Sequence, residues 1–334
     1  MAHDIAASPT PSAARRAPEA SAHTPDAPAR AEARRIEVIL NDSAGTGGEE
    51  ARAKLSEIFA EGGAEARVHL AQSGDELTEL AERAANDASC RAVVAGGGDG
   101  TINAVASHLV GTDKALGVLP LGTLNHFAKD LGIPLALEEA ARVLLAGHIQ
   151  LVDVGEVNGR YFLNNSSLGL YPHIVRERER HQERRGWGKW TAMARAAVTV
   201  LRRYPYMKVR LDADGREMVR RTPILFVGNN EYKLDAFEIG SRARLDAGQL
   251  SLHLTRATTR LGLFRLALGA LTGRLHEAED FESLNVREVN IRTRQSRARV
   301  ALDGEVTVMS TPLRYRIRPG ALRVFVPQPV TGEP

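Results

Sequence analysis

Short runs of aliphatic and β-branched residues alternate with amphipathic helical patterns over residues 36–146, and this alternation constrains the fold more than any other feature. The runs typical of strands lie at residues 36–40, 66–70, 92–95 and 116–119. The patterns typical of helices lie near residues 49–61, 75–87, 101–109 and 137–146. Strands that alternate with helices across short connections form a mostly parallel sheet covered by helices. The sequence therefore predicts an α/β domain over residues 36–150.

From about residue 151 the pattern changes to one made mainly of strands. Extended runs are expected at residues 151–157, 161–165, 208–211, 224–227, 250–254, 289–292, 299–302, 314–318 and 323–326. Helical patterns interrupt them near residues 189–203 and 261–274. Many short strands predict a β-sandwich or barrel. Since 334 residues suffice for two domains of roughly 150 residues each, we place this second, mainly β domain at residues 151–330.

Residues 1–35 are rich in Ala, Pro, Ser and Arg and show no apolar period, so we predict a disordered tail. The tail lacks the continuous apolar core of a secretory signal. Its arginines would suit an organelle transit peptide, but its acidic residues oppose that alternative.

Charge and cysteine content exclude several classes of protein. The net charge of +3 does not mark a nucleic-acid-binding protein, and no nucleic-acid partner is expected. The single cysteine, Cys90, can form neither an intramolecular disulfide nor a cysteine-based zinc site, which favours the cytoplasm. The longest stretch without a charged side chain, residues 161–175, is shorter than the roughly 20 residues of a membrane span.

The strongest local signal is the run Gly96-Gly97-Gly98-Asp99-Gly100-Thr101, between a predicted strand and a predicted helix. Glycines let the backbone approach a phosphate, and the free N–H groups of a helix start favour an anion. Asp99 would repel a phosphate, so it is expected to act as a ligand of a metal-bound water or as a base near the transferred group. A plain glycine-rich turn capped by Asp99 is the alternative. The run matches neither a P-loop, which needs Gly-Lys-Ser/Thr, nor the dinucleotide fingerprint, which needs glycine where Thr101 stands.

Two further loops leave predicted strands on the same side of the predicted sheet. One is Leu119-Pro120-Leu121-Gly122-Thr123-Leu124-Asn125, and the other is Asn41-Asp42-Ser43-Ala44-Gly45. Adjacent parallel strands open at the same edge of a sheet. Together the three loops point to a nucleotide polyphosphate.

At these residues the sequence resembles the diacylglycerol kinase catalytic-domain family, specifically the soluble bacterial lipid kinases related to eukaryotic diacylglycerol and sphingosine kinases. The resemblance covers residues 36–326 and rests on three motifs in order. They are Gly97-Gly98-Asp99-Gly100-Thr101-Ile102-Asn103, then Leu119-Pro120-Leu121-Gly122-Thr123 with Asn125 and Phe127, and finally Leu302-Asp303-Gly304-Glu305 followed by Thr311-Pro312. It implies an NAD-kinase/phosphofructokinase-like α/β domain and a β-sandwich domain with ATP bound between them.

The resemblance also implies which residues line the nucleotide: Asn41, Gly97, Gly98, Asp99, Gly100, Thr101, Asn103 and Thr123. Asp303 and Glu305 would supply the base that takes a proton from the lipid hydroxyl. Their spacing places both carboxylates on one face if the segment is extended, and the sequence does not decide between them. The alternative is an Asp-Gly hairpin turn followed by a solvated Glu.

Three positions depart from the family pattern. Ala104 stands where the family usually has Glu, and His126 where it usually has Asp. The metal-binding turn, commonly Asp-Asp-Gly in the family, reads Asp246-Ala247-Gly248. Asp246 is the residue that would substitute as a metal ligand at this turn.

Residues 176–210 contain eleven Lys or Arg and three Glu, together with Trp187, Trp190, Tyr204 and Tyr206. Basic residues interleaved with aromatic ones suit an anionic membrane surface, and the apolar pattern at residues 261–271 suits an acyl-chain groove. A solvated charged helix and an ordinary core helix are the alternatives.

The sequence thus predicts an ATP-dependent lipid kinase of phospholipid metabolism, cytoplasmic and peripherally membrane-associated, with Mg²⁺ carried by the nucleotide. Diacylglycerol or a related lipid is the expected acceptor. An NAD kinase-like enzyme and a catalytically silent lipid- or nucleotide-binding regulator are the alternative functions, and a homodimer is one open oligomeric state.

Overall fold

The fold is described from a computed structural model of the chain, over residues 35–42, 48–169, 206–235, 238–242, 244–255, 262 and 281–328. The predicted tail, apart from Arg35, lies outside the described residues. The same holds for the predicted helical patterns at 189–203 and 261–274 apart from Gly262, and for most of the basic segment at 176–210.

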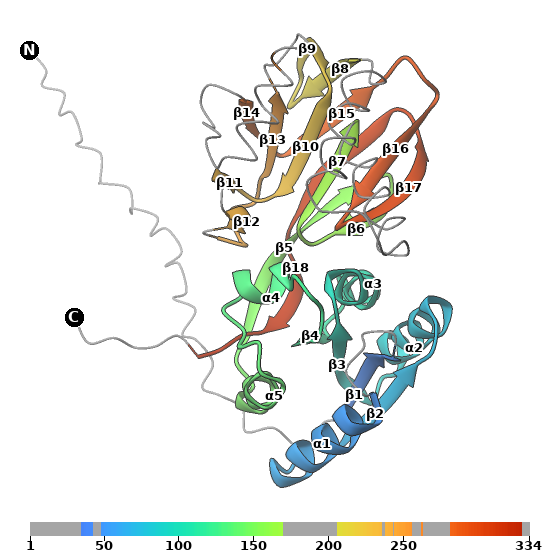
Figure 1. Ribbon diagram of the computed structural model, residues 1–334, viewed down its shortest axis with the longest axis vertical. Helices are drawn as coiled ribbons and strands as arrows, with labels where there is room; N and C mark the ends of the chain where they lie inside the picture. Colours follow the sequence, from blue (N-terminus) through green and yellow to red (C-terminus); the bar gives the residue numbers. More distant parts are fainter. Residues whose placement is uncertain are drawn as a thin grey trace, which may run out of the picture. The chain divides into compact units, whose positions relative to one another are not determined.

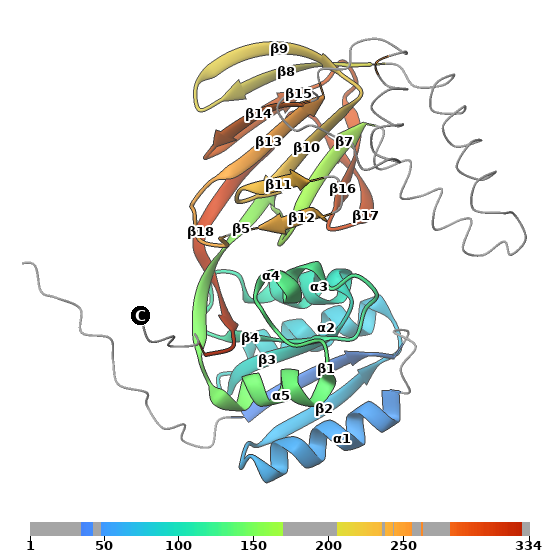
Figure 2. The ribbon, with the colours of Figure 1, turned by 60° about the vertical axis from the view of Figure 1, so that its left-hand side comes forward.

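The N-terminal lobe is the predicted α/β domain (Figure 1). Its parallel strands lie in the order β2 (Ala66–Ala71), β1 (Arg35–Asn41), β3 (Cys90–Gly97) and β4 (Ala115–Pro120). Helix α1 (Gly48–Glu61) contacts α5 (Leu137–Ala146), and α2 (Gly74–Asn86) contacts α3 (Asp99–Leu109). Figure 2 shows these two pairs on opposite faces of the sheet. Because both faces are covered, β4 is buried along its whole length, as a central parallel strand should be.

Local sequence explains where helix α2 begins. Ser73 caps α2 by accepting a hydrogen bond from the Glu76 N–H at 3.2 Å. Helix α3 begins at Asp99, two residues before the predicted start, with Gly98 as its N-cap. The short helix α4 (His126–Asp130) was not predicted, because five residues are too few to show a helical period.

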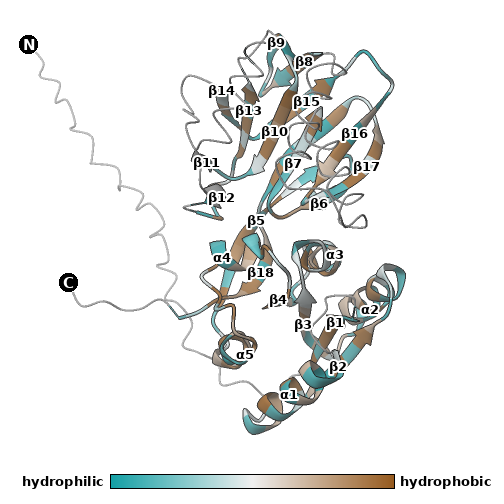
Figure 3. Ribbon diagram, in the orientation of Figure 1, coloured by the Kyte–Doolittle hydropathy of each residue, from teal (hydrophilic) through white to brown (hydrophobic). Residues whose placement is uncertain are grey.

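The C-terminal lobe is a β-sandwich, as predicted. One layer is an antiparallel sheet in the order β14 (Phe281–Val286), β13 (Leu250–Thr255), β10 (Ile224–Asn229), β7 (Asn165–Gly169), β16 (Arg297–Leu302) and β17 (Glu305–Ser310). The other layer contains β15 (Glu288–Arg292), β8 (Met207–Ala213) and β9 (Arg216–Thr222) next to the long strand β18 (Leu313–Phe325). A short hairpin of β11 (Tyr232–Asp235) and β12 (Glu238–Arg242) is separate from both. Figure 3 shows hydrophobic residues concentrated on the strands.

Several predicted strands differ from those in the structure. The run expected at 161–165 is broken after β6 (Arg160–Phe162), and β7 starts at Asn165. The runs expected at 314–318 and 323–326 form the single strand β18. Strands β9, β11, β12, β14 and β17 were missed because they are short or rich in polar residues.

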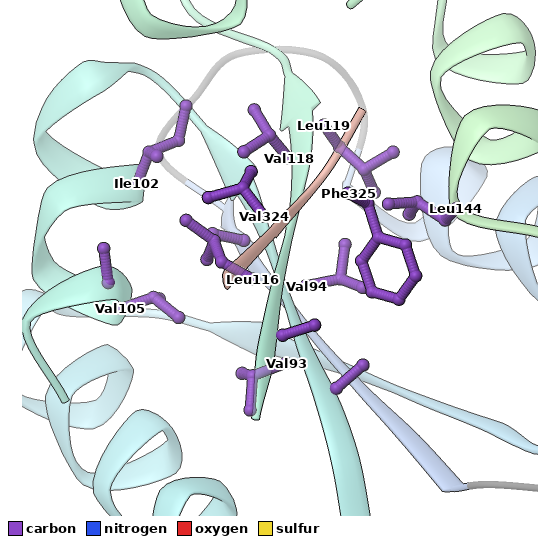
Figure 4. Packing of buried hydrophobic residues seen from close by; sticks show 14 of the residues in the cluster. Val93, Val94, Ile102, Val105, Leu116, Val118, Leu119, Leu144, Val324 and Phe325 are labelled. Atoms are coloured by element: carbon purple, nitrogen blue, oxygen red, sulfur yellow. The ribbon is translucent and has the colours of Figure 1, made fainter. Parts of the chain in front are cut away.

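Strand β18 and its neighbour β5 (Ile149–Val157) run through both lobes. The first part of β18 pairs with β15, whereas its end pairs in parallel with β4, with Arg323 opposite Ala115. Val324 and Phe325 pack beside Val94 and Leu116 of the N-terminal core (Figure 4). The end of β18 therefore completes the hydrophobic core of the N-terminal lobe, whereas its first part packs in the core of the C-terminal lobe.

None of the helices in the described part of the chain is long and apolar enough to cross a membrane.

Burial of His253 in β13 predicts a pH-dependent stability. The side chain is 3% exposed, its Nδ1 lies 2.8 Å from Ser283 Oγ, and burial lowers its pKa to about 4. Between pH 6.5 and 4 the unfolded chain binds a proton at this residue and the folded chain does not, so acid favours unfolding. We expect the free energy of unfolding to fall by about 3 kcal/mol more over this range in the wild type than in His253→Gln. Urea denaturation at a series of pH values measures the difference, and parallel curves would contradict it.

Candidate active site

Two of the predicted loops lie together with Asn41, the first residue of the third, at the carboxyl edge of the parallel sheet. Residues 43–45 of that third loop lie outside the described residues. Leu40 on β1 is opposite Gly96 on β3, and Gly97 is opposite Pro120 on β4. Asn41 donates a hydrogen bond from Nδ2 to Thr101 Oγ1 at 3.0 Å, which joins the end of β1 to the start of α3. The structure thus brings Asn41, the glycine loop and the β4–α4 loop into one site.

Close backbone packing explains why these loops need glycine. A Cβ on Gly122 would overlap the Cα of Gly98, so the two loops touch backbone to backbone. The Leu121 N–H also donates to the Gly97 carbonyl at 3.1 Å. No side chain caps α3 at Gly98, so the first N–H groups of this helix are available to an anion.

Asn125 shapes the second loop. It adopts a left-handed conformation with φ 51°, and its amide donates to the Gly122 carbonyl at 2.8 Å while Oδ1 accepts from the Gly122 N–H at 3.0 Å. Thr123, two residues before Asn125, is exposed at the loop surface. The Asn103 side chain is directed towards β6, where its Nδ2 donates a hydrogen bond to the Tyr161 carbonyl at 3.3 Å. The predicted contacts of Thr123 and Asn103 with a nucleotide stay predictions.

Asp99 is held by backbone donors. Its carboxylate accepts from the N–H groups of His126 at 3.2 Å and Phe127 at 3.1 Å, and so caps α4. The Asn164 side-chain amide, from the C-terminal lobe, lies 3.4 Å from the same carboxylate. These contacts correspond to the capping alternative for Asp99, although the cap is on α4 rather than on α3. Its predicted role as a base or ligand of a metal-bound water stays a prediction.

Asp303 and Gly304 form the turn of the β16–β17 hairpin, which is the Asp-Gly hairpin alternative for this motif. Both have positive φ, 45° and 92°, as a type I′ turn requires. The Asp303 carboxylate accepts three hydrogen bonds, from the N–H groups of Leu163 at 2.7 Å, Asn164 at 2.8 Å and Asn165 at 2.9 Å. Burial raises the pKa of Asp303 to about 6, although these donors and Arg242 act in the opposite direction. Asp303 therefore anchors the break between β6 and β7.

Glu305 lies on the other side of this turn and faces the N-terminal lobe. A Cβ on Gly100 would come within 2.8 Å of Glu305 Oε1, so the carboxylate rests against the glycine loop at the start of α3. The residue is exposed, and among the described residues no hydrogen bond or ion pair holds its side chain. The two carboxylates of the motif are thus separated: Asp303 is engaged with the backbone, and Glu305 is free beside the predicted phosphate site.

Sequence reasoning missed Asn164, Arg242 and Asp130. The Arg242 side chain is fully buried and bonds Asp130 Oδ2 at 2.7 Å and Asn164 Oδ1 at 2.8 Å. Burial raises the pKa of Asp130, and the Arg242 guanidinium opposes that rise. The adjacent polar residues 164 and 165 within a run expected to be a strand were the available signal for Asn164. Nothing in the local sequence distinguishes Arg242 from an exposed arginine.

The turn at Asp246 does not fit a metal site. Asp246 is exposed and pairs with Arg244 at 3.0 Å, while the N–H of Ala247 donates to Asn230 and that of Gly248 to Asp153. In the described ranges no group of three His, Cys, Asp or Glu side chains could hold a metal ion. We therefore derive no catalytic step through a metal at this turn.

Comparison with known families matches both lobes to one class of kinase. The family described as "Diacylglycerol kinase catalytic domain" matches residues 35–157. The family described as "YegS C-terminal NAD kinase beta sandwich-like domain" matches residues 175–326. These assignments agree with the α/β lobe and the β-sandwich seen in the structure, and they confirm the resemblance found in the sequence.

Individual relatives place the chain within that class. A Chromohalobacter salexigens protein named "Probable lipid kinase YegS-like" is 32% identical over 276 residues, covering 80% of this chain and 86% of that protein. A protein of the same name from Pseudomonas aeruginosa is 31% identical over 86% of this chain and 94% of its own length. This chain therefore belongs to the YegS-like lipid kinase family.

Solved structures confirm the fold. A Bacillus anthracis structure described as a diacylglycerol kinase has a TM-score of 0.66 at 20% identity, covering 89% of this chain and 98% of that chain. A second structure from the same organism has a TM-score of 0.72 at 21% identity, with 92% and 99% covered. At these identities the likeness concerns the fold alone.

Proposed function

We propose that this chain transfers the γ-phosphate of ATP to the hydroxyl of a lipid, with diacylglycerol as the first acceptor to test. In the proposed reaction, the hydroxyl oxygen attacks the γ-phosphorus, the bond to the β-phosphate oxygen breaks, and a carboxylate takes the hydroxyl proton. The products are ADP and a phosphorylated lipid. Mg²⁺ brought by the nucleotide would neutralise charge on its phosphate oxygens.

The position of Glu305 against Gly100 is the observation that carries this proposal. A general base must lie within hydrogen-bond reach of the proton it takes, close to the phosphate under attack. Glu305 has an exposed carboxylate next to the glycine loop, whereas Asp303 already accepts three backbone hydrogen bonds. We therefore assign the proton to Glu305 and a positioning role to Asp303.

Phosphate binding is assigned to the two touching glycine loops and the start of α3. Their N–H groups and the positive end of the helix dipole favour the charge that develops on the phosphoryl oxygens. The bond from Asn41 to Thr101 and the cap from Asp99 to α4 fix the positions of these loops. Such fixed donors need little rearrangement during the reaction.

A lipid acceptor is supported by the strand that Glu305 begins. Val306 and Val308 share one face of β17, and Glu305 lies on the opposite face at the start of the strand. Val308 is 59% exposed, which is unusual for a valine that packs in a core. It gives the strand that carries the proposed base an exposed apolar side chain. The membrane contact predicted for residues 176–210 stays a prediction, because most of that segment lies outside the described residues.

Transfer of labelled γ-phosphate from Mg-ATP to diacylglycerol, ceramide, sphingosine and NAD tests the proposal. We expect label in a lipid, and its loss in Glu305→Gln. Label in NAD alone would instead favour an NAD kinase-like enzyme. ATP binding without label in any acceptor would favour a catalytically silent regulator. Ala104 and Ala247, which replace the residues usual in the family, are the reason to consider that alternative.

A further inference from the structure

We propose that Arg242 is a positioning residue that latches the C-terminal lobe onto α3 and α4 and thereby places Glu305 against the glycine loop. The catalytic part of this inference rests on the proposed function. The latch itself is a set of contacts between the lobes, and it can be tested without turnover.

Arg242 ends β12, and its guanidinium binds groups from three separate elements. Nε donates to Asp130 Oδ2 on α4 at 2.7 Å. One terminal nitrogen donates to the carbonyls of Leu163 at 2.6 Å and Asn229 at 3.1 Å. The other donates to Asn164 Oδ1 at 2.8 Å. The group also lies over the Tyr232 ring, 5.3 Å from its centroid.

Asn164 extends this set of contacts to both acidic residues of the predicted site. Its side-chain oxygen accepts from Arg242, which leaves its amide nitrogen to point at Asp99, 3.4 Å away. Its backbone N–H donates to Asp303 at 2.8 Å. Asp99 caps α4, and Asp303 forms the turn that leads to Glu305. Arg242 thus fixes a residue that contacts both the start of α3 and the turn before the proposed base.

Only arginine can make all of these bonds at once. Its planar guanidinium has five N–H donors in a fixed arrangement, whereas a lysine ammonium is a single point with three. The Arg242 side chain is 0% exposed and that of Asp130 is 6% exposed, so removing one partner leaves a buried unpaired charge. A buried ion pair of this kind often adds little net stability, and in the best-attested cases it specifies one arrangement.

Arg242→Met, Arg242→Lys and the double variant Asp130→Asn/Arg242→Met test the latch. Arg244→Met is the matched control, because Arg244 is two residues away, exposed, and paired with Asp246 at the surface. We expect Arg242→Met to lower kcat about 100-fold, as small misplacements of reacting groups do. The Kd for ATP should change less than about threefold, because the loops proposed to bind it are in the N-terminal lobe. Arg242→Lys should recover part of kcat, and Arg244→Met should match the wild type.

The double variant separates positioning from stability. It removes the unpaired charge, so Tm should return towards the wild-type value while kcat stays low. Recovery of kcat together with Tm would overturn the proposal, since Arg242 would then be needed for stability alone.

Hydrogen exchange supplies a readout that does not depend on activity. Loss of the latch should expose the amides of Leu163, Asn164 and Asn165 and of helix α4 in Arg242→Met but not in Arg244→Met. Unchanged protection in Arg242→Met would overturn the latch. A wild type that transfers phosphate to no acceptor, but shows the exchange difference, would overturn the proposed function and leave the latch in place.

Discussion

In Glu305→Gln we expect kcat to fall by roughly 10²–10⁴, the range that a lost general base produces. Glutamine has nearly the same shape as glutamate but cannot take the hydroxyl proton. Because Glu305 is exposed and bonds no described residue, the fold should not change. Steady-state kinetics with the best lipid acceptor measures kcat, and thermal unfolding checks that Tm is unchanged.

Glu217→Gln is the control for this change, because Glu217 is an exposed glutamate on β9, away from the glycine loops. It should leave kcat within about twofold of the wild type, as a substitution outside the site does. A Glu305→Gln enzyme with near wild-type kcat and normal KM for ATP would remove Glu305 from the role of base. Asp99 or Asp303 would then be the next candidate.

Asp303→Asn should lower the free energy of unfolding, whereas Glu305→Gln should lower kcat. The asparagine oxygen can still accept from Asn164 and Asn165, but its NH₂ group then faces the N–H of Leu163. A buried donor left without an acceptor, and opposed by a second donor, is costly. We expect the free energy of unfolding to fall by roughly 2–4 kcal/mol, measured by urea denaturation at pH 7. Asparagine tolerates the positive φ of this position, so turn strain should not contribute.

The chain contains a matched control for Asp303. Asp214 occupies the same place in the Asp-Gly turn between β8 and β9, with φ 47°, and accepts from the N–H groups of Arg287 and Glu288. Those hydrogen bonds are exposed, so water can replace them. Asp214→Asn should therefore cost less than about 1 kcal/mol. Equal losses for the two variants would show that the Asp303 carboxylate is not a special anchor.

The sequence alone determined the fold class of the N-terminal lobe and the position of the glycine-rich loop between β3 and α3. The starts and ends of strands and helices depend on residues close in the sequence. The glycine-rich run Gly97-Gly98-Asp99-Gly100 can likewise be recognised from the sequence without knowledge of the fold. The same local signals predicted that the loops would open at one edge of the sheet, because parallel strands end on the same side. Three motifs in order were also enough to identify the family.

Only the tertiary structure shows what the acidic residues contact. Asp303 and Glu305 look equivalent in sequence, but Asp303 is bound by N–H groups about 140 residues earlier in the chain, whereas Glu305 faces Gly100. Asp99 is assigned to the cap of α4 by contacts across 27 and 28 positions. The bond between Arg242 and Asp130 and the pairing of β18 with β4 likewise join residues far apart in the sequence. Local patterns specify where a chain bends or extends, but the choice between a base, a cap and a latch depends on which distant groups burial brings within hydrogen-bond distance.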